Sequence, residues 1–108
     1  MVNFKEDLME SLIDLLGVLS EHKQSHNVNY FIGTLKNMIA IIQNIENPEL
    51  PNECIEKLRK MYKSMFFPRD GLSDFYILDS DATYMTKCNT QFSSLLNRID
   101  ALLEEGGS

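Results

Sequence analysis

The chain has few cysteines, no long apolar run and no glycine-rich phosphate loop, and each absence excludes a class of protein. Its only cysteines, Cys54 and Cys88, do not form a short-spaced pair, so we expect neither a disulfide framework nor a zinc knuckle. Both fall at apolar helix positions, where thiols pack as small hydrophobic groups. No uninterrupted apolar stretch approaches the roughly 20 residues that span a bilayer, so we expect no membrane partner.

Positive charge is also scarce. The chain of 108 residues contains 10 Lys and Arg against 16 Asp and Glu, which gives a formal net charge of -6. Nucleic acid is therefore not expected as a direct ligand, because phosphate binding needs clustered positive charge. An acidic surface instead favours a basic protein partner and speeds the encounter with it. The alternative that the acidity only keeps the protein in solution stays open.

The composition that remains predicts a folded domain. Hydrophobic residues make up 44% of the chain and charged residues 24%, which is close to ordinary globular usage. We expect one helical domain over residues 1–105, with residues 106–108 as a flexible tail or a vestige of cloning. The amino-terminal segment carries acids early and lacks the basic region of a signal peptide, so the expected location is the cytoplasm.

Apolar residues recur at helical spacing in four segments. The clearest of them runs from Met85 to Leu103 over more than four turns, and the most apolar runs from Phe31 to Ile45, so we expect the latter to be the most buried. The expected helices span residues 4–22, residues 27 or 29 to about 45, residues 53–66 and the segment after residue 81. Four such segments with short connections predict an all-α fold, a compact bundle of about four helices with an ordered loop before the last helix.

Several residues indicate where the helices begin, end or meet. Pro48 and Pro51 cannot continue a helix, and Asn52 is well placed to cap the third one. One residue of 79–81 is expected to cap the last helix, since acids are favoured near a helix start. Gly33 in the second segment indicates either a close approach of a neighbouring helix or a surface glycine without a special role.

A metal site is not expected. His22 and His26 lie four residues apart, a spacing at which two imidazoles can bind zinc, but residues 23–25 supply no general-base Glu and the stretch is polar. The histidines are therefore interpreted as solvated side chains.

The start of a calcium loop is likewise only superficial. Asp79, Asp81 and Thr83 alternate as calcium ligands do, but the sixth position is Tyr84 where a Gly is needed. The twelfth is Thr90 where the loop requires Glu. No metal or other cofactor is predicted.

Catalytic groups are not apparent in the sequence. A nucleophile needs a base within reach and a third group that orients the base, and neither cysteine has such neighbours along the chain. We therefore expect a protein that is not an enzyme. A small hydrolase that depends on Asp74 remains a third possibility.

Acids cluster at the beginning of the first expected helix. Glu6, Asp7, Glu10 and Asp14 fall at spacings that include i,i+4, where like charges oppose helix formation by a few tenths of a kcal/mol. Such a stripe is explained by a basic partner, or more simply by a solvated helix face. The charge is also uneven along the chain, because residues 48–68 hold three acids and four bases, a net charge of +1.

The loop before the last helix combines turn signals with apolar and acidic side chains. Pro68 should end the third helix, and Asp70-Gly71 is a turn dipeptide. Leu72 and the apolar residues of 75–78 should be buried, because ordering a loop must be offset by burial. Arg69, Asp74 and Tyr76 have no such local role; the full loop is FFPRDGLSDFYILDSD, residues 66–81.

Residues 65–77, MFFPRDGLSDFYI, carry a resemblance. With the polar break and the Phe- and Leu-rich helix that follow, they resemble a family of small uncharacterised bacterial helical proteins with a Pro-Arg-Gly-Gly-Leu-Ser-Asp-Phe-like loop. Asp70 stands where a second glycine is usual. Some members are similar to immunity proteins of polymorphic or contact-dependent toxin systems, and the resemblance implies stoichiometric inhibition of a cationic effector.

These observations lead to a functional expectation. The chain is expected to be an immunity-type protein that binds a cognate, cationic bacterial toxin domain, for example a nuclease, and covers its active or substrate-binding site. The expected contacts are Arg69, Asp70, Asp74, Tyr76, Asp79 and Asp81 of the loop, and Glu6, Asp7, Glu10 and Asp14 of the first helix.

Two alternatives stay open. The chain could be a helical adaptor or regulatory subunit that holds a partner helix in an apolar groove. It could also form a homodimer, because a small bundle often buries apolar surface against a second copy.

Overall fold

The structure, a computed structural model, describes residues 4–21, 28–47, 49–66, 71–72, 77 and 80–106. This part of the chain forms four helices and contains no strand. The all-α fold predicted from the apolar periodicity is therefore confirmed. The helices are α1 (Phe4–Glu21), α2 (Val28–Gln43), α3 (Asn52–Lys63) and α4 (Ala82–Gly106).

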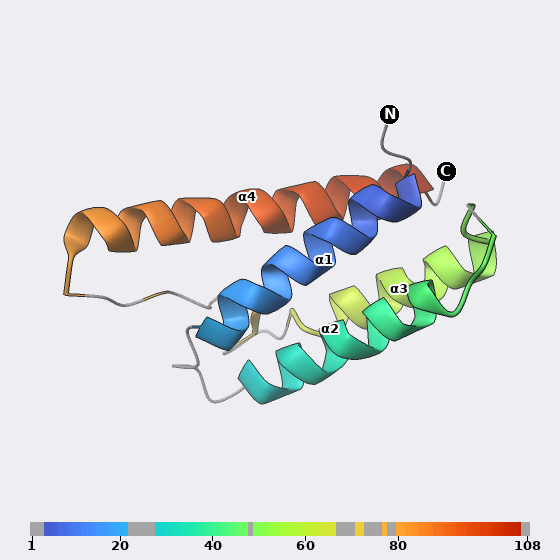
Figure 1. The fold of residues 1–108 in the computed structure, drawn as a ribbon, viewed down its shortest axis with the longest axis horizontal. Coiled ribbons are helices and arrows are strands. Elements are labelled where there is room, and N and C mark those ends of the chain that lie inside the picture. The colour runs from blue at the N-terminus through green and yellow to red at the C-terminus, as the bar shows by residue number, and fades with distance from the viewer. Residues whose placement is uncertain are drawn as a thin grey trace.

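The four helices form a closed ring of neighbours. α1 packs against α2 and α4, while α3 packs against α2 and α4, so α1 and α3 take diagonal positions. Successive helices run in opposite directions, and the start of α1 lies at the same end of the bundle as the end of α4 (Figure 1). α4 has 25 residues against 18 in α1, and its first turns extend beyond the other helices.

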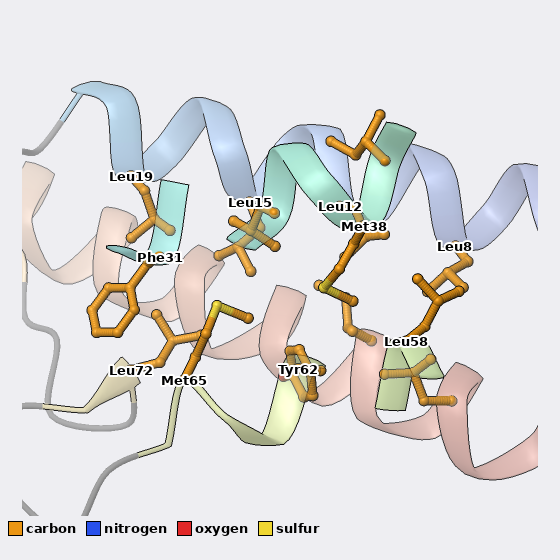
Figure 2. Close-up of a cluster of buried hydrophobic side chains, with 14 of the residues drawn as sticks. Leu8, Leu12, Leu15, Leu19, Phe31, Met38, Leu58, Tyr62, Met65 and Leu72 are labelled. Carbon is orange, nitrogen blue, oxygen red and sulfur yellow. The ribbon is translucent and has the colours of Figure 1, made fainter. Parts of the chain in front are cut away.

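The core lies along the inner faces of the helices. In α1 the inner face is a leucine stripe, and Figure 2 shows these side chains pointing toward residues from α2, from α3 and from the segment that follows α3. The stripe consists of Leu8, Leu12, Leu15 and Leu19, all with no exposed surface. The spacing of three and four residues places them on one side of a helix, as the sequence predicted. Burial of this stripe holds α1 in place.

α2 is the most buried helix, as expected. Eight of its 16 residues are buried, including Phe31, Leu35, Met38 and Ile42, compared with five of 18 in α1. The helix ends at Gln43, so Ile45 lies just beyond it and is only half-buried. Its position beyond the helix is fixed by Lys5 of α1, whose Nζ donates to the backbone carbonyl oxygens of Ile45 and Asn47.

α3 differs from its expected limits at both ends. Pro51 occupies the N-cap position in an extended conformation and its carbonyl oxygen accepts from the Ile55 N–H at 3.0 Å, so Asn52 is the first helical residue and the prediction that it caps the helix is wrong. At the other end the helix stops at Lys63, three residues early. The Ser64 hydroxyl donates to the Met61 carbonyl oxygen at 2.6 Å, and this competition with the backbone ends the helix.

Tyr62 ties α3 to α4 inside the core. The residue is 1% exposed, and its hydroxyl donates to the backbone carbonyl oxygen of Leu96 at 3.1 Å. Burial, reinforced by the carboxylate of Asp100, raises the pKa of the phenol above its ordinary range. The hydroxyl therefore remains a protonated donor at neutral pH.

Gly33 has no close neighbour. A Cβ atom built at this position meets nothing within 4 Å, which contradicts a close helix approach and supports the surface alternative. We expect Gly33→Ala to raise the free energy of unfolding by about 0.5–1 kcal/mol, because Ala loses less backbone entropy in a helix. Urea denaturation measures the change. The reciprocal control is Ala40→Gly at an exposed position of α2, and equal stabilities of Gly33→Ala and the unmodified chain would contradict the prediction.

Candidate functional site

The described part of the loop before α4 is packed against the core. Leu72 and Ile77 have no exposed surface, and the Leu72 N–H donates to the Met65 carbonyl oxygen at 2.7 Å. Figure 2 shows Leu72 and Met65 beside Phe31 of α2. The expectation that apolar residues fix this loop is therefore confirmed for Leu72 and Ile77.

The Asn89 side chain holds the loop to α4. Its Oδ1 accepts from the backbone N–H of Ile77 at 2.8 Å, and its Nδ2 donates to the carbonyl oxygen of Ile77 at 3.0 Å. The same Nδ2 also donates to the Met85 carbonyl oxygen within α4. One amide thus satisfies both backbone groups of a buried loop residue, a role that the sequence analysis did not assign.

Asp81 caps α4. Its Oδ1 accepts from the backbone N–H groups of Thr83 at 3.0 Å and Tyr84 at 3.1 Å, so the capping prediction for residues 79–81 is confirmed at Asp81. The side chain is exposed, but its carboxylate already has this structural function. The other predicted contacts of the loop, Arg69, Asp70, Asp74, Tyr76 and Asp79, lie outside the described residues.

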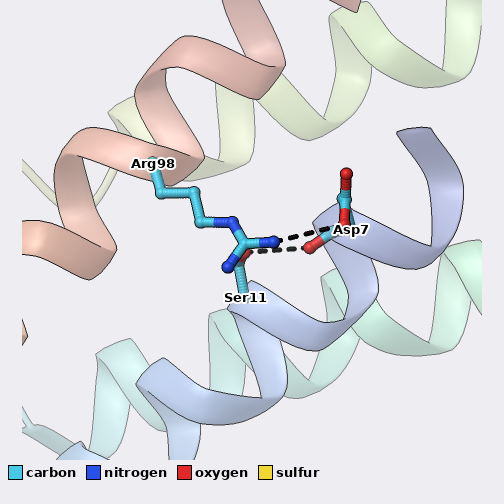
Figure 3. A network of polar contacts seen from close by, with 3 residues as sticks. All are labelled: Asp7, Ser11 and Arg98. Carbon is cyan, nitrogen blue, oxygen red and sulfur yellow. Dashed lines mark hydrogen bonds and ion pairs between the residues drawn. The ribbon is translucent and has the colours of Figure 1, made fainter. Parts of the chain in front are cut away.

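Asp7 is partly neutralised within the bundle. Its Oδ1 lies 3.2 Å from Nη2 of Arg98 on α4, and its backbone carbonyl oxygen accepts from the Ser11 hydroxyl at 2.9 Å (Figure 3). The Arg98 side chain is 48% exposed, so solvent screens the pair and its contribution to stability is at most about 1 kcal/mol. Asp7 therefore already has a contact within the bundle.

The outward face of α1 carries the remaining acids. Glu6, Glu10 and Asp14 are exposed at successive turns, with Glu21 on the same face. Lys5, the only base of α1, has its ammonium group on the backbone carbonyls after α2. The exposed face of α3, on the diagonal helix, bears Lys57, Lys60 and Lys63. Glu53 and Glu56 are exposed on α3 as well, so the charge on α3 is mixed, whereas the outward face of α1 is acidic throughout these positions.

An open groove of about 450 Å³ lies between the second half of α1 and the first half of α4. The two helices diverge toward this end in Figure 1. The groove is lined by Ile13, Asp14, Gly17, Val18 and Glu21 from α1 and by Tyr84, Lys87, Cys88 and Gln91 from α4. Asp14 alone among them was predicted as a contact. We call this feature the α1/α4 groove.

The sequence contained only one signal for this groove. Ile13 falls on the polar side of α1, opposite the leucine stripe, and the structure leaves 48% of it exposed. An apolar residue out of phase with its helix is a detectable pattern. The partners of Ile13 on α4 were not detectable, because they depend on how two distant segments pack.

The described residues hold no group of three or more His, Cys, Asp and Glu side chains that could bind a metal ion. His22 and His26, with the spacing considered for zinc, lie outside the described residues. Both cysteines are reduced and half-buried. Burial raises the pKa of the Cys54 thiol, with a smaller opposing effect of Lys57, so this thiol is less nucleophilic at neutral pH.

Within the described ranges, no helix combines the length and the apolar character that a bilayer crossing requires. Comparison with protein-family models, with curated proteins and with solved structures gave no match to this chain.

Proposed function

We propose that this chain is an immunity-type protein that binds a cationic bacterial toxin domain, for example a nuclease, and neutralises it by covering its substrate-binding site. The observation that carries the proposal is the acidic face of α1, where Glu6, Glu10, Asp14 and Glu21 are exposed along one side of the helix. Like charges at i,i+4 work against the helix, so a gain elsewhere would explain the pattern. Contact with a basic surface supplies such a gain.

Inhibition is explained by the fact that phosphate groups and carboxylates bind the same basic side chains. A nuclease holds phosphate groups with Lys and Arg side chains, and carboxylates bind the same side chains through charge-assisted hydrogen bonds. An acidic helix placed over that site competes directly with the substrate. The concentration of acids on the outward face of α1 would also orient the protein during its approach to a basic partner.

Residues 65–77 support the same proposal through their resemblance to a family of small bacterial helical proteins, some members of which are similar to toxin immunity proteins. On this basis Arg69, Asp70, Asp74, Tyr76 and Asp79 remain proposed contacts of the partner. A Tyr side chain buries a large area with little loss of conformational entropy, which suits an interface.

The first test is co-expression with the protein encoded next to this one. We expect a stable complex and protection of cells from the toxicity of that neighbour. A neighbour that is toxic, forms no complex and kills cells equally with and without this chain would contradict the proposal.

The acidic face is tested by its effect on association. We expect the double variant Glu10→Gln, Asp14→Asn to associate with the toxin about tenfold or more slowly at about 0.1 M salt, because steering charges act mainly on the on-rate. In about 1 M salt, where the Debye length falls to about 3 Å, the difference should nearly vanish. Stopped-flow fluorescence measures both rates.

The matched control is Glu53→Gln, Glu56→Gln. Both residues are exposed, and the change in net charge is the same, but they lie on α3. Their replacement should leave the on-rate within about twofold of the unmodified chain, because steering depends on where the charge is located. An equal slowing by both double variants would show that net charge alone matters, and the acidic face would lose its assigned role.

The α1/α4 groove, whose lining mixes apolar and charged residues, favours a second candidate function, a helical adaptor or regulatory subunit that holds a partner helix between two helices. Salt distinguishes the two functions. An affinity and an on-rate that do not change with ionic strength would favour the adaptor.

A further inference from the structure

The α1/α4 groove contains two of the three large apolar side chains that the described residues expose. Ile13 is 48% exposed and Tyr84 is 43% exposed, and they come from opposite sides of the groove. The half-buried side chains of Val18 and Cys88 also line it. Apolar surface that gathers in one depression and is bordered by charged residues is typical of an interaction site.

The charges along the two sides of the groove differ in sign. Asp14 and Glu21 lie on the α1 side, and Lys87 lies on the α4 side beside the uncharged Gln91. Within the part of the chain that the structure describes, neither Asp14 nor Glu21 has an ion-pair partner. The acidic face of α1 continues from Asp14 to Glu10, one turn earlier. An occupant therefore gains most when its Lys or Arg side chains lie along α1.

Gly17 forms an unobstructed stretch of the α1 side. A Cβ atom built there meets nothing within 4 Å, so no packing constraint within the described structure requires a glycine. A glycine inside a helix lowers stability by about 0.5–1 kcal/mol relative to Ala. The missing side chain keeps the groove open between Ile13 and Glu21, and it allows a partner to approach the backbone of α1.

The shape of the groove favours a helix as the occupant. A groove between two helices accepts the ridge of a third, as in helix–helix packing. The groove is open along one side, whereas sites for small ligands enclose most of the ligand surface. A second copy that docked through the same face would bring only one base among the lining residues, Lys87, for the two acids Asp14 and Glu21, which is poorer charge complementarity than a basic helix provides.

We infer that the α1/α4 groove binds one amphipathic, basic helix of a partner protein. The apolar ridge of that helix packs between Ile13 and Tyr84, and Lys or Arg side chains on one flank pair with Asp14 and Glu21. The inference rests on the proposed function, because it assigns a docking site to the cationic toxin. It adds the structural class of the segment that binds.

The test uses a synthetic peptide helix of about 18 residues, roughly five turns, with Leu on one stripe and Lys and Arg on the flanks. NMR titration of the full isotope-labelled chain maps where it binds. We expect shifts of backbone amides concentrated at residues 13–21 and 84–91, and none of that size on α3. A peptide with Glu in place of every Lys and Arg should bind about tenfold or more weakly. Shifts centred on another surface, or no binding of the basic peptide, would overturn the inference.

The decisive variant fills the groove without disturbing the fold. Gly17→Gln places a side chain in open space and improves helix propensity, and Gly33→Gln makes the same change in α2 away from the groove. Gly17→Gln should weaken peptide binding about tenfold or more, as expected for a blocked central contact, and Gly33→Gln should leave it unchanged. Ile13→Ser provides a second variant at an exposed position. Undiminished binding by Gly17→Gln and Ile13→Ser would refute the site.

The same variants separate this inference from the proposed function. If the unmodified chain and Gly17→Gln neutralise the toxin equally well, the groove is not the docking site, although the immunity function is retained. If instead the basic peptide binds in the groove but the neighbouring protein is neither bound nor neutralised, the groove is confirmed as a binding site for a basic helix and the immunity function is contradicted.

Discussion

Replacing Leu12 with Ala should lower the free energy of unfolding by about 2–5 kcal/mol. Leu12 has no exposed surface and lies in the middle of the leucine stripe of α1 (Figure 2). Its removal loses the transfer free energy of the buried carbons and leaves a cavity that the neighbouring helices cannot fully close. The loss is a large fraction of the 5–15 kcal/mol that stabilises a typical domain. Urea denaturation, analysed at constant m-value, measures it.

The adjacent residue supplies the matched control. Ile13 is 48% exposed on the opposite face of α1, so Ile13→Ala should change the free energy of unfolding by less than about 0.5 kcal/mol. For binding of the basic peptide we expect the opposite ranking. Ile13→Ala should weaken binding more than Leu12→Ala, because Ile13 lines the α1/α4 groove and Leu12 does not. If Leu12→Ala unfolds the chain entirely, Leu12→Met serves as a milder variant that should cost less than about 1.5 kcal/mol. Equal stability losses at positions 12 and 13 would contradict the assigned orientation of α1.

Asn89→Ala should cost about 2–3 kcal/mol, the second largest expected effect, because a buried donor and acceptor would lose their partners. The Asn89 amide is the hydrogen-bond partner of both the N–H and the carbonyl oxygen of Ile77. Ile77 has no exposed surface, so water does not readily replace the amide. Asn89→Asp should also destabilise, since a carboxylate oxygen would face the Ile77 carbonyl oxygen.

Hydrogen exchange distinguishes a local effect of Asn89 from a general one. The Ile77 amide should exchange faster in Asn89→Ala, because its acceptor is gone. Amides in the middle of α2 should change only as far as global stability changes. Thr90→Ala, at the exposed position next to Asn89, should leave the exchange rates of the Ile77 amide and of the α2 amides unchanged. Unaltered protection at Ile77 in Asn89→Ala would show that another group holds the loop.

The sequence predicted the helices well because their apolar residues dominate the energetics. The stripe from Leu8 to Leu19 can be buried only on one side of a helix, and α1 begins and ends within one residue of its expected limits. The errors occurred where single hydrogen bonds decide. Ser64 competes for a backbone carbonyl and shortens α3, and Pro51 displaces Asn52 from the N-cap.

The candidate site was predicted only in part, and the reason is tertiary. Glu10 and Asp14 could be placed on one exposed face from their spacing alone. The groove beside them depends on how α1 and α4 diverge, and no local pattern relates Gly17 to Lys87. The ion pair of Asp7 with Arg98 was undetectable for the same reason. Periodicity thus predicts which face of a helix is free, but not which distant helix borders it.

The pairing of α1 with α4 joins the two helices that are farthest apart along the chain, while the other contacts join consecutive helices. The contact between the first and last helices therefore closes the longest stretch of chain and has the largest loop-closure entropy cost among these helix pairs. The α1/α4 groove exists only after this step. A partner bound there recognises the fully folded chain and not a partly folded one, so its binding free energy adds to global stability. Newly synthesised chains would then become able to bind such a partner only once the last helix has docked.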